Sequence, residues 1–475
     1  MARLDSRLER EMYTDVKMRE LIRFGVGYHH AGLPPRVREA VEAAITEGLI
    51  TVVIATTTLA DGVNFPFSTV IVQSLAVKDP TFETGRQMSW RVFTPRKFWN
   101  IAGRAGRPGS DHEGQVILYE PSLMLEHAGS IDPYLQPGIR EIPPVTSALA
   151  GGLSDLRAQV QTGEVSLADL RKAELPEKLP KRTRGLVNLL RVGLAHARAT
   201  GSQVPGRSYF DATFASRTMS GRDFDFAGSL VREQDAVLAT YLSGEGAPTV
   251  ELVAELGLSI DTLTRLQFWV QSMPTWQLKR MGEALYGPAI NFNQLKYIIG
   301  PVLKNMAELE GRKLSGWYST VVEDWCRGKP FSQIKPTNRE PRLEDLIGLM
   351  YSQIQYILPW GLYATDRFVA EESTLRNIDY DKQVTQLAYL VDAGVPDMGA
   401  LRLTSAGFER TDAARLSTEY LRSAARTSTD IIGWLRAQPR ERVAALIRGH
   451  DRRRLDYDFD RVLRDLGGPA SSEGG

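Results

Sequence analysis

Hydrophobic positions in the first 120 residues alternate between continuous apolar runs and helical spacing. Four short apolar runs predict β-strands, at residues 25–31, 50–56, 68–75 and 114–120. The run at 50–56 (ITVVIAT) is almost entirely β-branched, as expected for a buried parallel strand. An amphipathic helix between the first two runs opens at Pro34 and Pro35 and ends at Gly48. This β-α-β alternation predicts an α/β domain with a parallel sheet and helical cover.

The pattern changes after Tyr119. Residues 130–145 (SIDPYLQPGIREIPPV) are rich in proline, which is typical of a linker. From about residue 150 the strand runs disappear and helical periodicity dominates. We therefore expect an α/β domain at 1–125, a linker at 126–150, a helical region at 151–300, a helical bundle at 301–465 and a compositionally disordered tail at 466–475.

The string FWNIAGRAGRPG, at residues 98–109, carries the strongest candidate chemistry of the chain. Arg104 and Arg107 stand three residues apart in a helix that we expect within residues 94–107, so they share a face. Gly103 and Gly106 are costly in a helix, which indicates that something approaches the backbone closely. Two guanidiniums that cannot lose their charge suit a phosphate chain. A surface helix with two solvated arginines is the alternative interpretation.

Two further strings precede this one, HHAGL from His29 to Leu33 and ATTTLADGVNFP from Ala55 to Pro66. In order and spacing the three blocks resemble the second RecA-like motor domain of superfamily 2 helicases. The resemblance is to the large processive branch that holds the exosome-associated and spliceosomal RNA helicases and the archaeal repair helicases. Asn100 and Ile101 depart from the glutamine and methionine that the family usually has in the third block.

The resemblance implies a nucleotide site. Arg104 and Arg107 match the family's two motif arginines, which reach across a cleft to the γ-phosphate of ATP. Such arginines neutralise charge that develops on the transferred phosphoryl group. Asn100, with Gly103 beside it, falls near the nucleotide, although Asn100 is one methylene shorter than the usual glutamine.

The resemblance also implies contacts with nucleic acid, either DNA or RNA. Thr56 matches the threonine that binds the nucleic-acid backbone. Gly62 and Asn64 match the loop that couples the nucleotide to the strand. ATP with magnesium is the implied cofactor, held mainly by a first motor domain.

The 475 residues contain neither a GxxxxGK[ST] phosphate loop nor a DExH or DEAD tetrad. We therefore expect the first motor domain on a partner polypeptide, the second domain to lack its opening strand, and the chain not to hydrolyse ATP unaided. The alternative is a non-catalytic scaffold, derived from a helicase, that binds nucleic acid or protein.

The composition of the chain limits the functional and structural classes to which the protein can belong. With 58 basic and 57 acidic residues, no global field attracts nucleic acid, so any such contact must be local. A single cysteine, Cys326, excludes an internal disulfide framework and indicates a reducing, cytoplasmic setting. No run approaches the length of a membrane span, and the N-terminus has no signal-peptide pattern. For the pair His29 and His30 we expect hydrogen bonding at a strand end and no metal site.

Residues 249–270 have a helix-turn-helix pattern, with a turn at Gly257 and a second helix that Ser259 can cap and Thr262 opens. In a repressor such a second helix reads the major groove. Here it carries a largely apolar series, Leu263, Leu266, Phe268, Trp269 and Val270. This series favours packing, and the helicases of the branch contain a winged-helix domain that packs against the motor.

Two segments of the helical part resemble further family features. Residues 316–334 resemble the WxxGxxFxxI signature of the exosome-type helicases, through Trp325, Gly328, Phe331 and Ile334. The resemblance implies a bundle that lines the strand exit and acts as a ratchet; a plain core anchored by tryptophans is the alternative. Residues 393–416 resemble a helix-hairpin-helix, whose turns either present amides to phosphate or serve packing alone.

Overall fold

The computed structural model describes two compact units, Met1–Val145 and Thr146–Gly475. The described residues are 16–30, 33, 35–56, 67–78, 90–92, 94–106, 113–119, 134, 147–202, 206–211, 213–244, 247–307, 318–330, 333–334, 346, 349–379, 386–406, 408–423 and 431–447.

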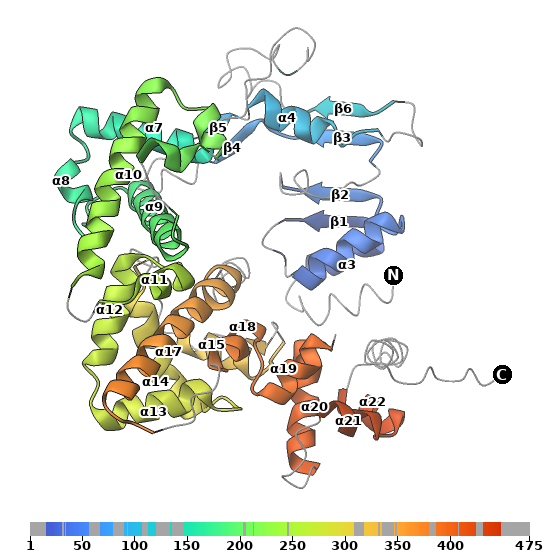
Figure 1. Cartoon of the computed structure of the whole chain (residues 1–475). Coiled ribbons are helices and arrows are strands. Elements are labelled where there is room, and N and C mark those ends of the chain that lie inside the picture. The colour runs from blue at the N-terminus through green and yellow to red at the C-terminus, as the bar shows by residue number, and fades with distance from the viewer. Residues whose placement is uncertain are drawn as a thin grey trace. The chain divides into compact units, whose positions relative to one another are not determined.

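The first unit combines short strands with helices (Figure 1). Its helices are α2 (Val16–Arg23), α3 (Pro35–Thr46) and α4 (Pro95–Ala102), and its strands are β1 (Val26–His29), β2 (Val52–Ala55), β3 (Thr69–Val72), β4 (Ala76–Lys78), β5 (Trp90–Val92) and β6 (Gln115–Leu118). β1 pairs with β2 and β3 with β6, both in parallel, whereas β4 and β5 form an antiparallel pair. The four strands expected from the apolar runs are confirmed, and the β4–β5 pair is an addition to them.

Helix α3 begins and ends as the sequence predicts. Pro35 is its first residue, and Gly48, two residues beyond its end at Thr46, has a positive φ of 70°. Glycine adopts this left-handed backbone without the steric cost that a Cβ brings.

The expectation that 50–56 forms a buried strand is wrong in its burial. β2 is parallel to β1, yet Val52 and Ile54 are exposed. The described helices α2 and α3 pack chiefly against β1, so they leave the β2 side chains accessible. A smaller core lies beside β3, where Phe98 and Ala102 of α4 pack with Val72, Leu75 and Tyr134.

The described elements of the second unit are helices, joined by loops and accompanied by one isolated antiparallel bridge between Ala289 and Asp397 (Figure 1). Its α-helices are α7 (Ala148–Thr162), α8 (Leu167–Leu170), α9 (Lys181–Ala199), α10 (Gly221–Leu242), α11 (Val250–Leu256), α12 (Ile260–Gln271), α13 (Thr275–Tyr286), α14 (Phe292–Asn305), α15 (Tyr318–Cys326), α17 (Leu358–Leu375), α18 (Leu387–Ala393), α19 (Met398–Ser405), α20 (Arg410–Ser423), α21 (Ile431–Arg436) and α22 (Arg440–Ile447). Two 3-10 turns, η3 (Gly206–Phe210) and η4 (Phe214–Arg217), and a π-helical segment, η7 (Met350–Ile357), complete it. The buried hydrophobic residues of this unit form one core, whose members lie between Leu153 and Val443 in the sequence.

The predicted turn between α11 and α12 is confirmed. Gly257 has a positive φ of 62°, and the Ser259 hydroxyl accepts a hydrogen bond from the Thr262 amide at 3.2 Å. The second helix starts at Ile260, two residues before the predicted opening. Its buried face, Leu263, Leu266 and Val270, contributes to the core, whereas Phe268 is 73% exposed. Because α12 packs against α14 and α17, this face serves packing.

Among the described helices, none combines the length and the apolar character that crossing a membrane requires.

Candidate functional site

Arg104 lies in the turn that follows α4. Thr94 caps the start of this helix, because its hydroxyl accepts a hydrogen bond from the Lys97 amide at 3.3 Å, and Pro95 occupies the first turn. The helix ends at Ala102, and the Arg104 amide donates to the Ile101 carbonyl at 3.1 Å. The helix expected within residues 94–107 therefore starts where the sequence predicts, but it ends at Ala102, before Arg104.

The close backbone approach that the glycines predict is made by the chain itself. Gly106 has a φ of 78°, and its amide donates to the Phe67 carbonyl at 2.9 Å. A Cβ on Gly106 would lie 2.9 Å from the Gly114 nitrogen, and one on Gly114 would lie 2.3 Å from the Ala105 carbonyl carbon. The segments before β3 and β6 thus fix the backbone on the C-terminal side of Arg104.

His29, in the HHAGL string, ends β1 and is held by α3. Its Nε2 lies 2.8 Å from Glu42 Oε1, and the side chain is almost fully buried. Its carbonyl accepts the amide of Thr56 at 3.2 Å. The expectation that this histidine serves hydrogen bonding at a strand end is confirmed.

The described candidate residues lie at two places in the first unit. Asn100, Gly103 and Arg104 share the end of α4, whereas Thr56 directly follows β2. Gly62, Asn64 and Arg107 lie outside the described residues.

The described side chains fit one part of an ATP–magnesium complex. The half-buried Arg104 offers a permanent cation to a phosphate chain. Among the described residues, no group of three or more His, Cys, Asp or Glu side chains is placed to hold a metal ion. The described part of the site therefore includes a guanidinium, whose charge would suit phosphate, but no carboxylate cluster for magnesium.

A second candidate site is an aromatic stripe on η7 and α17 that the sequence analysis missed. Tyr356 is 67% exposed and Trp360 is 44% exposed, and Tyr363 and Arg367 follow at helical spacing. Residues three or four apart share a helix face, so the four side chains form one row. We call Tyr356, Trp360, Tyr363 and Arg367 the α17 stripe. Its 4-3-4 spacing is equally that of a buried helix face, so the exposure of Tyr356 and Trp360 is what distinguishes it from core residues.

The backbone beneath the α17 stripe is held closely by α14. A Cβ on Gly361 would lie 2.5 Å from the Met306 sulfur and 2.7 Å from Val302 Cγ1, so only glycine permits this approach. The π-helical turn η7 precedes α17 and alters the helical register there. The stripe is therefore carried by a rigid helix, as a binding surface requires.

Glu255, on α11, contacts two members of the α17 stripe. The Tyr363 hydroxyl donates to its Oε1 at 2.6 Å, and Arg367 Nη2 donates to its Oε2 at 3.3 Å. The hydrogen bond to this carboxylate is the main cause that raises the pKa of Tyr363, followed by burial.

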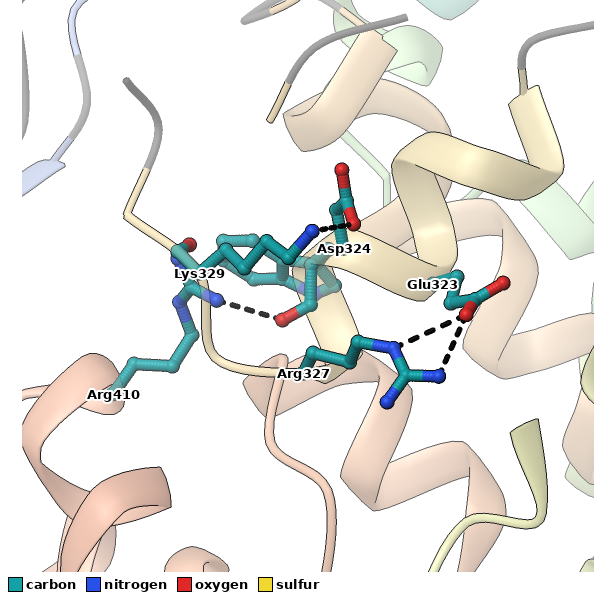
Figure 2. Close-up of polar contacts among 6 residues, drawn as sticks. Glu323, Asp324, Arg327, Lys329 and Arg410 are labelled. Atoms are coloured by element: carbon teal, nitrogen blue, oxygen red, sulfur yellow. Dashed lines mark hydrogen bonds and ion pairs between the residues drawn. The ribbon is translucent and has the colours of Figure 1, made fainter. Parts of the chain in front are cut away.

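The signature around Trp325 is a packed junction (Figure 2). The indole Nε1 donates to the Val391 carbonyl at 2.7 Å, and Arg410 Nη1 donates to the Trp325 carbonyl at 2.7 Å. Around this turn, Figure 2 shows Lys329 paired with Asp324 and Arg327 paired with Glu323. Ile334 is buried, and Phe331 lies outside the described residues.

The Gly-Val-Pro turn of the helix-hairpin-helix segment serves packing. The Gly394 amide donates to the Val391 carbonyl at 3.2 Å, and the Val395 amide donates to the Leu390 carbonyl at 3.0 Å. A Cβ on Gly394 would lie 2.2 Å from the Trp325 ring. Because both amides already have partners in the chain, this turn does not offer them to a phosphate.

Comparison with known proteins agrees with the motif blocks. Residues 4–109 match the family described as helicase conserved C-terminal domain. The ATP-dependent DNA helicase Hel308 of Aeropyrum pernix is 34% identical over 178 residues, which is 35% of this chain and 23% of that protein. Superkiller complex protein 2 of Mus musculus and the antiviral helicase SKI2 of Saccharomyces cerevisiae are each 39% identical over 110 residues, which is 23% of this chain and 8% of either relative.

The matched stretches are thus less than a quarter of these relatives' own lengths. They confirm the resemblance stated from the sequence. Residues 4–109 match a helicase C-terminal domain, and this part of the chain is similar to superfamily 2 helicases of the branch that includes Hel308 and SKI2.

Proposed function

We propose that this chain is the strand-tracking part of an ATP-dependent helicase or translocase. In this proposal Arg104 and Arg107 complete a nucleotide site whose phosphate loop belongs to a first motor domain on a partner polypeptide. The observation that carries the proposal is the helicase domain match at 4–109, which includes the arginine string. These 475 residues contain no phosphate-loop string, so the proposed nucleotide site takes its phosphate loop from outside them.

The arginines act on charge. ATP, when bound with magnesium by the partner, supplies the phosphoryl group whose transfer releases free energy. Arg104 and Arg107 are proposed to stabilise the negative charge that develops on that group, while Asn100 and Gly103 line the approach. The close approach of the Gly106 and Gly114 backbones restrains the chain beside Arg104. This restraint lowers the free-energy cost of orienting the Arg104 guanidinium.

The strand contacts are proposed at two places. Thr56 would bind the nucleic-acid backbone, with Gly62 and Asn64 coupling it to the nucleotide. In the helical unit, the α17 stripe would stack bases on its aromatic rings and attract phosphate through Arg367. Stacking tolerates any base, because every base has a π-face, and this suits a motor that moves along a strand.

The helical unit around the stripe is proposed to include a winged-helix-like region within 151–300. A non-catalytic scaffold that binds nucleic acid or protein is the second candidate. The paired motif arginines favour the motor, because a scaffold needs neither of them.

The test is ATP turnover by the purified chain, alone and mixed with a first motor domain that carries a phosphate loop and a DExH tetrad. The proposal expects nucleic-acid-stimulated turnover only in the mixture. Turnover by the chain alone would contradict the need for a partner, and an inactive mixture that still binds strand would favour the scaffold.

A further inference from the structure

Two donors of the α17 stripe are engaged by a carboxylate from a neighbouring helix. Glu255 accepts the Tyr363 hydroxyl at 2.6 Å and Arg367 Nη2 at 3.3 Å, so each carboxylate oxygen has its own donor. A phosphate oxygen recognises the same two kinds of donor, a hydroxyl and a guanidinium. Glu255 thus occupies the place where a strand phosphate would bind.

This contact is open to exchange. The Glu255 side chain is 40% exposed and that of Arg367 is 46% exposed. Exposed ion pairs contribute little net stability, because water solvates both partners almost as well when they separate. A phosphate can therefore displace the carboxylate without unfolding α11 or α17.

We propose that Glu255 is an internal competitor of the nucleic-acid strand at the α17 stripe. It keeps Arg367 and Tyr363 engaged when no strand is present, and it must release them for a phosphate to bind. The proposal rests on the proposed function, since it takes the α17 stripe as a strand-contact surface. It adds that Glu255 lowers the affinity of the α17 stripe for the strand, so that the strand is held loosely enough to move.

The charge of Glu255 and its contacts can be separated by variants on one helix. Glu255→Gln removes the charge and keeps the side chain's length. Glu251→Gln removes the same charge one helical turn away, where the side chain is exposed and forms no hydrogen bond or ion pair with the stripe within the described residues. Tyr363→Phe keeps a ring for stacking and releases one oxygen of Glu255.

The experiment measures the affinity of the full chain for fluorescent oligo(dT) and oligo(U) by anisotropy at several salt concentrations. Removing a like charge about 4 Å from a phosphate predicts a roughly 5- to 10-fold tighter complex for Glu255→Gln at low salt. Glu251→Gln should change affinity less than about 2-fold, because its charge is more distant and screened. Tyr363→Phe removes one donor from the phosphate as well as from Glu255, so it should not reproduce the gain in affinity of Glu255→Gln.

Two outcomes separate this inference from the proposed function. If Trp360→Ala weakens binding but Glu255→Gln does not strengthen it, the proposed role of Glu255 is wrong and the α17 stripe remains the strand surface. If Trp360→Ala leaves the affinity for the strand unchanged, the α17 stripe is not the strand surface. The proposed competition by Glu255 is then wrong as well. Equal gains from Glu255→Gln and Glu251→Gln would show a general charge effect and contradict the competitor.

Discussion

The guanidinium of Arg410 lies 3.9 Å from the centre of the Trp325 ring. The same group donates to the carbonyls of Trp325, Gly394 and Lys329, so one side chain joins the end of α15 to the α18–α19 turn. Cation–π contact and charge-assisted hydrogen bonds act together here. This junction ties the signature segment to the helix-hairpin-helix segment.

Arg410→Ala should destabilise the helical unit by about 2–3 kcal/mol, because three carbonyls lose a charged donor. Urea unfolding followed by circular dichroism measures this change. Arg422→Ala, on the exposed side of α20, is the matched control and should change the free energy of unfolding by less than about 0.5 kcal/mol. Equal effects of the two substitutions on the free energy of unfolding would contradict a stabilising role of this junction.

Asp261 gives the helical unit a pH dependence of defined sign. The side chain is 2% exposed, and its Oδ1 accepts the Leu175 amide at 3.2 Å. Burial raises the pKa of Asp261 to about 6, against the opposing effects of that amide and of Arg191. The folded state therefore binds this proton more tightly than the unfolded chain, whose aspartates titrate near pH 4. Its stabilising contribution is complete below about pH 4 and is lost as the pH rises through about 6.

Asp261→Asn keeps the acceptor for Leu175 and removes this titration. We expect the stability of the variant, relative to the natural chain, to increase as the pH rises from about 4 to 6. Denaturant unfolding at a series of pH values measures the difference. Asp366, whose pKa burial also raises to about 6, is present in both proteins and cancels. Parallel stability curves would show that Asp261 is not protonated preferentially in the folded state.

Gly106 and Gly48 form a matched pair for the backbone next to Arg104. Both have a positive φ, but a Cβ on Gly48 would meet nothing within 4 Å, whereas one on Gly106 would meet the Gly114 backbone at 2.9 Å. Gly48→Ala should cost only the left-handed strain, about 1–2 kcal/mol. Gly106→Ala should cost clearly more, as a lower midpoint of thermal unfolding of the first unit. Equal losses of stability in the two variants would mean that the backbones at Gly106 and Gly114 are not closely packed.

Trp360→Ala tests the α17 stripe. Loss of one stacking platform should weaken binding of single-stranded nucleic acid by about 1–3 kcal/mol, or roughly 5- to 150-fold. Trp276→Ala on α13 removes another exposed tryptophan, 67% accessible, that is not part of the stripe. The affinity of the Trp276→Ala variant for single-stranded nucleic acid should stay within about 2-fold of that of the natural chain. If Trp276→Ala weakens binding as much as Trp360→Ala does, strand binding is not specific to the stripe.

Local signals in the sequence predict much of the first unit. β-branched runs locate β1, β2, β3 and β6, and Pro35 and Gly48 mark the ends of α3. Burial was less predictable, because β2 has the composition of a buried strand while its neighbours among the described elements cover β1 instead. The start of α4 was predicted correctly, since Thr94 and Pro95 open the helix, but its end was placed too late, because the helix ends at Ala102 with Gly103 as its cap.

In the helical unit, the sequence does not show which face of a helix is buried. Tyr356 and Trp360 lie within an apolar stretch that reads as core, and only their placement on one exposed row distinguishes them. The π-helical turn at η7 shifts the helical register at that point, which simple periodicity does not anticipate. The Gly-Val-Pro turn left two interpretations open until its amides were found bonded within the chain.

The central claim is that this chain completes a nucleotide site with arginine. Its most direct test is the ATP turnover of Arg104→Ala and Arg107→Ala, each mixed with a first motor domain and single-stranded nucleic acid. The account predicts that either substitution lowers the turnover rate roughly 10³-fold or more while strand affinity is retained. An unchanged turnover rate in an otherwise active mixture would contradict it.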